Sequence, residues 1–332
     1  MRNPMIILLL PLVAAILFFY PKPDRYAVSR QPANELQTAL YGRLQAAGLQ
    51  GNELATVGAL TLGYKQELDP QLKKLFQASG AAHVLAVSGL HTGIIYGVLI
   101  WLLTFGGRLK PQYENRIGRW CLSLVVIAAM WGYAWLTGMT PSVVRAVLMV
   151  SVYEIGRMAY RQAFSLNTVA TAAFIILVVR PTDLWSVSFQ LSFAATAAII
   201  ILCSGFTYIR FPALRYLITV LLVSLAAQLG TLPLTMYYFG QFSNYFLLTN
   251  LIVLPLATLL VPCGLLTVAF GGCWAGLALG RITGWLAGLM NHAVGWIEHL
   301  PGSTTQVQID AVMVGIYYII FIIFCFFFRK TD

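Results

Sequence analysis

The stretch FLLTNLIVLPLATLLVPCGLLTVAF, residues 246–270, contains no charged side chain. A helix crosses the hydrocarbon core of a bilayer with about 20 predominantly apolar residues, and this stretch is long enough. It nevertheless contains Asn250 and Pro255, which leave polar groups in need of a partner at membrane depth. We therefore predict a spanning helix that is either kinked against its neighbours or interrupted where protein or water can satisfy those groups.

The composition of the whole chain also indicates a membrane protein. Of its 332 residues, 59% are hydrophobic and 10% are charged, and the mean hydropathy is +0.78. Soluble chains carry about a quarter charged residues, so the shortage of charge excludes an ordinary soluble domain. The net charge of +10 does not by itself indicate an anionic ligand, because Lys and Arg hold the inner loops of membrane proteins in place.

The cysteines are not expected to bind metal or to form disulfides. They lie within apolar runs and show no paired ligand spacing, so we interpret them as packing residues. The sequence predicts no metal site and no cofactor. The cysteines concerned are Cys121, Cys203, Cys263, Cys273 and Cys325.

Apolar runs separated by charge clusters and Gly/Pro breaks recur along the chain. We expect an all-α polytopic membrane protein with about ten transmembrane or broken helices. The Lys and Arg residues gather in alternate connections, which places both termini in the cytoplasm under the positive-inside rule. The predicted runs are 5–20, 82–105, 119–137, 141–156, 163–180, 186–204, 214–238, 246–270, 273–297 and 309–328.

The chain is expected to form three parts. Residues 1–20 are predicted to be an uncleaved transmembrane anchor, because no small-x-small cleavage site follows Tyr20. Residues 21–81 are predicted to lie along the extracytoplasmic membrane surface as an amphipathic helical segment. Residues 82–332 are predicted to form one multi-helix membrane domain.

Two helices are predicted within the interfacial segment. Residues 36–49 carry an apolar stripe, with Gln37 on another side of the helix. Residues 68–80, LDPQLKKLFQASG, predict a helix with Asp69 as its N-cap, Pro70 in its first turn and Gly80 at its end.

Polar residues within the apolar runs are candidates for a pathway or an internal pair, because they are costly in lipid. Arg145 could extend to the lipid headgroups or turn inward, and the sequence leaves both open. The prolines that follow polar amides indicate either kinked helices packed against neighbours or broken helices around a polar vestibule. The candidates are Arg145, Gln190, Ser192, Gln228 and Asn250, with Pro141, Pro233 and Pro255 as helix breaks.

The stretch HVLAVSGLHTGIIYGVL, residues 83–99, allows three kinds of chemistry. A metal site is disfavoured, because His83 and His91 lie about 80° apart around a helix and no Asp, Glu or Cys is nearby. A serine protease would pair Ser88 with His292 from a later helix. A pore or gate would use the glycines to thin or break the helix. Its residues would be His83, Ser88, Gly89, His91 and Gly93.

A family resemblance favours the pore. GAAHVLAVSGLHTG, residues 80–93, is similar to the signature of the ComEC competence-domain family. Four further strings resemble the family in the same order, and together the resemblance extends from about Leu54 to Pro262. They are LDPQLKKLFQASG, GMTPSVVRAVLM, RPTDLWSVSFQLSFAATAAI and AAQLGTLPLTMYYFGQFSNYFLLTNLIVLPLA.

The resemblance implies an inner-membrane channel for uptake of single-stranded transforming DNA, rather than an enzyme. It implies as partners single-stranded DNA, an extracytoplasmic DNA receptor, a cytoplasmic helicase or translocase, membrane lipids and a separate nuclease. The OB-like and metallo-β-lactamase-like domains of the family have no counterpart in this sequence, so any strand degradation is expected from another protein. A small-solute permease is the alternative function, followed by the protease.

The channel hypothesis assigns roles to particular residues. Residues 83–93 are expected to form the outer end of a pore-lining or pore-supporting helix. Polar and aromatic side chains that tolerate any base would line the path of an unpaired strand. Besides the polar candidates above, they are Tyr237, Tyr238, Phe242, Asn244 and Tyr245.

Overall fold

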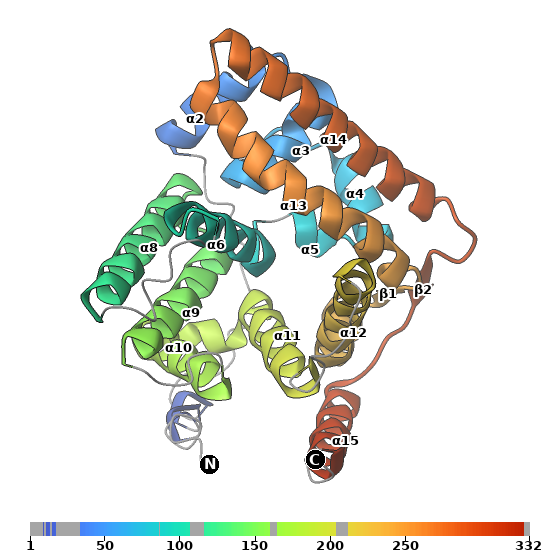
Figure 1. The fold of residues 1–332 in the computed structure, drawn as a ribbon. Helices are drawn as coiled ribbons and strands as arrows, with labels where there is room; N and C mark the ends of the chain where they lie inside the picture. The colour runs from blue at the N-terminus through green and yellow to red at the C-terminus, as the bar shows by residue number, and fades with distance from the viewer. Residues whose placement is uncertain are drawn as a thin grey trace.

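The architecture comes from a computed structural model, which describes residues 9, 11–13, 15–17, 34–85, 87–106, 116–159, 165–203 and 212–328. Helices make up almost all of its regular structure (Figure 1). The elements are α2 Glu35–Ala46, α3 Gly51–Leu62, α4 Pro70–Ala78, α5 Ala82–Leu85, α6 Gly89–Leu103, α8 Arg116–Leu136, α9 Pro141–Met158, α10 Leu166–Val179, the 3-10 helix η1 Pro181–Trp185, α11 Val187–Cys203, α12 Pro212–Phe239, β1 Gln241–Ser243, α13 Phe246–Phe270, α14 Trp274–Glu298, β2 Thr304–Gln306 and α15 Ala311–Phe328.

The expected all-α class is confirmed, but ten spanning helices are not. Within the described ranges, three helices are long and apolar enough to cross a membrane: Arg116–Leu136, Leu214–Phe239 and Phe246–Phe270. Further apolar helices are shorter. Helices α9 and α14 lie in predicted spans but do not combine the length and apolar character that a membrane span requires. The predicted anchor at 1–20 lies mostly outside the described residues. The shorter apolar helices are Gly89–Leu103, Leu166–Val179, Val187–Cys203 and Ala311–Cys325.

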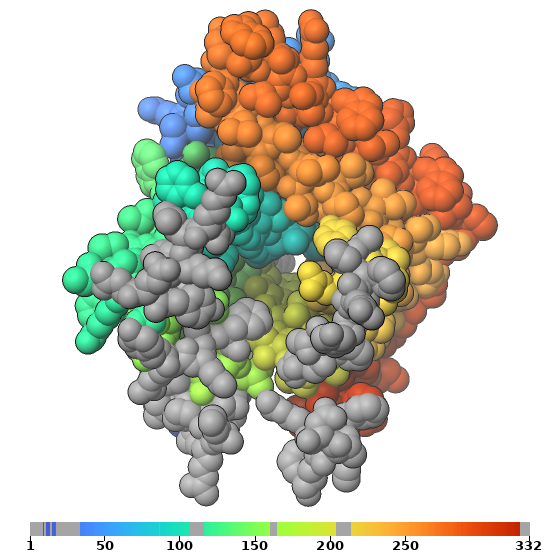
Figure 2. Space-filling model, viewed as in Figure 1, coloured from blue at the N-terminus to red at the C-terminus, as the bar shows by residue number. Residues whose placement is uncertain are grey.

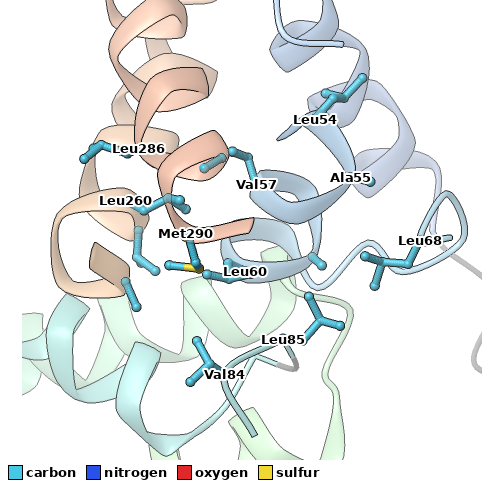
Figure 3. Close-up of a cluster of buried hydrophobic side chains, with 14 of the residues drawn as sticks. Leu54, Ala55, Val57, Leu60, Leu68, Val84, Leu85, Leu260, Leu286 and Met290 are labelled. Atoms are coloured by element: carbon cyan, nitrogen blue, oxygen red, sulfur yellow. The ribbon is translucent and has the colours of Figure 1, made fainter. Parts of the chain in front are cut away.

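Helix α3 forms the centre of the largest apolar core, and the sequence analysis did not predict it. Its residues 54–62 are all buried. The helix packs against α13 and α14, where Leu60 faces Met290 and Val57 lies near Leu260 (Figure 3). A helix that is apolar or small on every side is typical of a core position. The segment 21–81 therefore contains a buried helix and does not lie flat on a surface throughout.

Helix α2 differs from its predicted orientation. Gln37, expected away from the apolar stripe, is buried, and its Nε2 donates to the carbonyl of Leu62 at 2.8 Å. Gln37 also forms a capping box with Asn34, which satisfies the free N–H groups of the first turn. On the same helix Tyr41 stacks on Tyr64, with ring centroids 4.3 Å apart. Burial raises the pKa of Tyr41 to about 12, so its phenol remains neutral.

Helix α4 matches its prediction. Asp69 accepts a hydrogen bond from the backbone N–H of Gln71 at 2.9 Å, and Pro70 is the first helical residue. Gly80, two residues after the helix, has a φ of +88°, which a residue with a side chain rarely adopts. The polypeptide can therefore turn there towards α5.

Small residues let the helices of this core approach closely. A Cβ on Gly264 of α13 would collide with the side chain of Thr61 in α3. A Cβ on Gly280 of α14 would collide with the backbone carbonyl of Ala47, next to α2. Helices in apolar surroundings gain stability from such close backbone contact.

Five helices form a closed ring beside this core. Among the described residues, α6 packs on α9, α9 on α11, α11 on α12, α12 on α13, and α13 on α6, while pairs across the ring share at most incidental contacts. Helices α8, α10, α14 and α15 pack on the outside of the ring. The space-filling view is hollowed between the teal residues of α6 and the yellow residues of α12 (Figure 2).

The short strands join two loops of this bundle. β1, which follows α12, pairs antiparallel with β2, which follows α14, and Phe242 opposes Thr305. Asn244 donates from Nδ2 to the carbonyl of Gly302 at 2.6 Å and to Oγ1 of Thr305 at 2.8 Å. Tyr245 donates to the carbonyl of Pro301 at 2.9 Å. Asn244 and Tyr245, considered as pore candidates, therefore hold one loop against another.

Substitution of Gly264 tests the close packing of α13 on α3. Gly264→Val should destabilise the protein by about 1–3 kcal/mol, because the added carbons overfill a packed contact. Gly284→Val is the matched control, since a Cβ on Gly284 in α14 meets no atom within 4 Å. The midpoint of thermal unfolding in detergent measures both, and equal midpoints would contradict the packing described here.

Candidate functional site

The helix that begins near His83 is broken. α5 ends at Leu85, α6 begins at Gly89, and Val87 and Ser88 between them are not helical. The backbone N–H of Ser88 donates to Nδ1 of His91 at 3.1 Å, and the Ser88 hydroxyl lies 3.1 Å from the same nitrogen. Ser88 is thus the N-cap of α6, and His91 completes its first turn.

The contacts of His91 and Ser88 also test the metal site and the serine protease considered above. His91 is fully buried. Because its Nδ1 accepts a hydrogen bond, a neutral ring carries its proton on Nε2. This Nε2 has no partner among the described residues. No group of three His, Cys, Asp or Glu in the described part of the chain could hold a metal ion. Ser88 contacts His91, whereas His292 lines a pocket with residues of α3 and α4, so the geometry gives a Ser88–His292 pair no support.

Three glycines at four-residue spacing give α6 a thin face. Gly89, Gly93 and Gly97 are exposed, and each lies about one helical turn from the next on the same side of α6. A Cβ on Gly93 or Gly97 would meet no atom within 4 Å, and one on Gly89 would only touch Ala146 of α9 at 3.9 Å. These glycines therefore do not serve close packing within the described chain. They leave open space beside the first turns of α6.

Arg145 turns inward and does not extend to a headgroup. Only 3% of it is exposed, and its Nη2 donates to the hydroxyl of Ser188 at 2.6 Å. Its Nε has no partner among the described residues. The interaction joins α9 to α11, two neighbours in the ring. Arg145 is thus placed at a joint between helices.

Gln190 occupies the next joint. Its Nε2 donates to the carbonyl of Leu184 in η1 at 3.0 Å, and its Oε1 accepts from the hydroxyl of Tyr238 at 2.9 Å. The second bond joins α11 to α12. Ser192 and Gln228 are partly buried on the same two helices, and no side-chain hydrogen bond of either is found in the described part of the chain.

Pro233 lies inside a continuous helix and does not interrupt it. Proline lacks the N–H that would bond the carbonyl four residues earlier, which here belongs to Leu229. Tyr317 of α15 donates its hydroxyl to that carbonyl at 2.9 Å, and Tyr318 donates to the next one, Gly230, at 2.8 Å. A neighbouring helix thus supplies the donors, as required in apolar surroundings.

The other proposed breaks also differ from expectation. Pro141 is the first residue of α9 and begins the helix, because its fixed φ suits a first turn. Pro255 lies within the continuous helix α13, as does Pro262. Asn250 on α13 is 8% exposed, and its Oδ1 has no partner among the described residues.

Glu154 is a buried carboxylate that the sequence analysis missed. It is fully buried on α9 and accepts hydrogen bonds from Tyr96 of α6 at 2.5 Å, Ser123 of α8 at 2.6 Å and Arg157 at 2.9 Å. Donors from three helices satisfy a charge that would otherwise be costly in the interior. The only signal in the sequence was an acidic residue within a predicted span, three positions before an arginine.

The chain is similar to known proteins. A family model described as Competence protein matches residues 60–331. The ComE operon protein 3 of Bacillus subtilis (strain 168) is 29% identical over 263 residues, which is 78% of this chain and 31% of that protein. The Competence protein ComA of Neisseria gonorrhoeae is 29% identical over 166 residues, 49% of this chain and 23% of that protein.

A third relative matches over a length comparable to that of the Bacillus protein. The Recombination protein 2 of Haemophilus influenzae is 24% identical over 250 residues, 69% of this chain and 30% of that protein. The chain therefore spans less than a third of the length of each of these relatives. No solved structure matches the chain.

A double-mutant cycle tests the role of Tyr317. Tyr317→Phe should destabilise the protein by about 1–3 kcal/mol, because the carbonyl of Leu229 loses its donor. In a Pro233→Ala background the restored N–H can bond that carbonyl, so Tyr317→Phe should cost less. Unfolding in detergent measures both costs. Tyr216→Phe, an exposed tyrosine of α12, is the control, and an equal cost of Tyr317→Phe in both backgrounds would refute the role.

Proposed function

This chain belongs to the family described as Competence protein, and from that premise we propose that it conducts a single strand of transforming DNA across the inner membrane. The relative from Neisseria is named a competence protein. The observation that carries the proposal is the closed ring of α6, α9, α11, α12 and α13 around a hollow.

The polar contacts of the ring support a conduit with a stable wall. Arg145 joins α9 to α11, Gln190 joins α11 to α12, and Glu154 joins α9 to α6 through Tyr96. Each of these side chains forms a hydrogen bond with a neighbouring helix, so each fixes the spacing of two helices of the ring. A wall of fixed circumference suits a polymer that moves through it one nucleotide after another.

The open face of α6 supports passage of an unpaired strand. Gly89, Gly93 and Gly97 add no side chain to the space beside them. Every base and every phosphate must pass the same point, so a small and neutral surface there tolerates all four bases. The break at Ser88 places the open first turn of α6 at the start of this surface.

The remaining assignments follow from this direction of transport. Both termini lie in the cytoplasm, an extracytoplasmic receptor delivers the DNA, and a cytoplasmic helicase or translocase supplies the energy. A separate nuclease degrades the complementary strand. In this orientation the exposed Arg116 at the start of α8 faces the inner side, where a cation attracts the emerging phosphates.

Blocking the glycine face tests the conduit. Gly93→Trp should reduce transformation to the level of a strain without the chain, because an indole would fill the space beside α6. Folding should be unaffected, since a Cβ on Gly93 meets no atom within 4 Å. The measurement is transformation frequency in a deletion strain complemented with the full chain, together with DNA bound at the cell surface, which should not change.

The control places the same indole elsewhere. Gly315→Trp in α15, which packs on the outside of the ring, should leave transformation unchanged, because Gly315 is equally open. Normal transformation by Gly93→Trp at a normal protein level would show that the strand does not pass this face.

A further inference from the structure

A pocket with a few polar groups in a mainly apolar lining lies apart from the ring, between α3, α4 and the second half of α14. Its volume is about 470 Å³. On α14, Gly288 and Gly295 lie on either side of Asn291 and His292 and add no side chain to the pocket. Residues three, four and seven apart share one face of a helix, so these four residues line the pocket together.

Glu53 gives the pocket a free carboxylate. It lies in the first turn of α3, and its Oε1 is 3.7 Å from the position that a Cβ on Gly288 would take. No ion pair or hydrogen bond of this carboxylate is found in the described ranges of the chain. An ionised carboxylate accepts hydrogen bonds only, and it can accept two side by side.

Asn291 supplies a donor of fixed orientation. The hydroxyl of the fully buried Thr56 donates to its Oδ1 at 3.0 Å. The amide nitrogen Nδ2 therefore points elsewhere, and it is buried without a partner among the described residues. A buried donor without a partner is costly, and a ligand with an acceptor at this point would remove that cost.

An aromatic wall completes the pocket. Trp296 is 58% exposed and lies about one turn beyond Asn291 and His292. Leu72 and Leu75 of α4 also line the pocket. An indole that is half open to solvent beside polar groups is suited to stack a flat ring, and base stacking on aromatic side chains holds unpaired nucleic acid bases in this way.

We propose that this pocket binds an unpaired nucleobase and prefers guanine. The Watson–Crick edge of guanine presents two adjacent N–H donors followed by a carbonyl acceptor. Glu53 accepts the two donors, Asn291 donates to the carbonyl, and Trp296 stacks on the ring. Adenine, cytosine and thymine present their donors and acceptors in other orders, so each leaves at least one of these protein groups unpaired. The inference rests on the proposed function, because it assigns the base to the strand that is taken up.

Binding of defined single strands tests the pocket. The probe is a fluorescently labelled oligothymidine strand with one central deoxyguanosine, and the comparison strands carry deoxyadenosine or thymidine there. The full chain in detergent or lipid nanodiscs should bind the guanine strand about 10-fold more tightly, as expected for one well-formed set of base hydrogen bonds. Glu53→Gln and Asn291→Asp should each remove the preference, and Trp296→Ala should weaken binding of all three strands.

Matched controls separate the pocket from the rest of the surface. Trp285→Ala removes another exposed indole of α14, and Glu67→Gln removes an exposed carboxylate outside the pocket; both should keep the preference. Equal affinity for the three strands, or an unchanged preference in Glu53→Gln and Asn291→Asp, would overturn the proposal. Guanosine monophosphate bound as tightly as the guanine strand would also overturn it, because the occupant would then be a free nucleotide.

The failure of this inference is distinguishable from the failure of the proposed function. Transformation that requires an open α6 face, together with equal affinity for the three strands, would leave the conduit standing and refute the pocket. Guanine preference that depends on Glu53, together with normal transformation by Gly93→Trp, would keep the base pocket and refute the path along α6.

Discussion

A polar group inside an apolar helix bundle has no water to bind, so its partner must come from the protein. This constraint explains where the polar residues of the ring lie. Arg145 bonds Ser188 between α9 and α11, and Gln190 bonds Tyr238 between α11 and α12. Tyr96 bonds Glu154 between α6 and α9. Each bond satisfies two groups at once and ties neighbouring helices, so three of the five contacts of the ring are fixed by polar side chains.

The same constraint limits what can line the hollow. In the conduit proposed above, side chains that are already bonded to a neighbouring helix would not be available to a passing strand. The surface left over is small and neutral, as on α6, where glycines recur every fourth residue. In the proposed conduit, an absence of fixed charge on this face would avoid a tight binding point for any single phosphate. The ring thus uses two kinds of residue. Hydrogen-bonded polar side chains fix the positions of the helices, and the glycines of α6 leave its backbone uncovered.

Local signals in the sequence predicted local structure well. The apolar stretch 246–270 is one helix, and Asp69 and Pro70 begin α4, because capping and apolar length depend on residues close in sequence. Partners that lie far along the chain could not be predicted. The burial of Gln37 depends on the carbonyl of Leu62, and the inward turn of Arg145 depends on Ser188. Helix α3 was missed because a short run that is apolar on all sides has no stripe to mark it. Pro233 was expected to break a helix whose freed carbonyl is in fact bonded by a tyrosine 88 residues later.

The two tyrosines of α15 carry a consequence for biosynthesis. Each hydroxyl donates to a carbonyl that precedes it by 88 residues in the chain. The carbonyls beside Pro233 are therefore translated long before the hydroxyls that bond them. Until α15 has been made, those carbonyls need another donor, and α15 then supplies it.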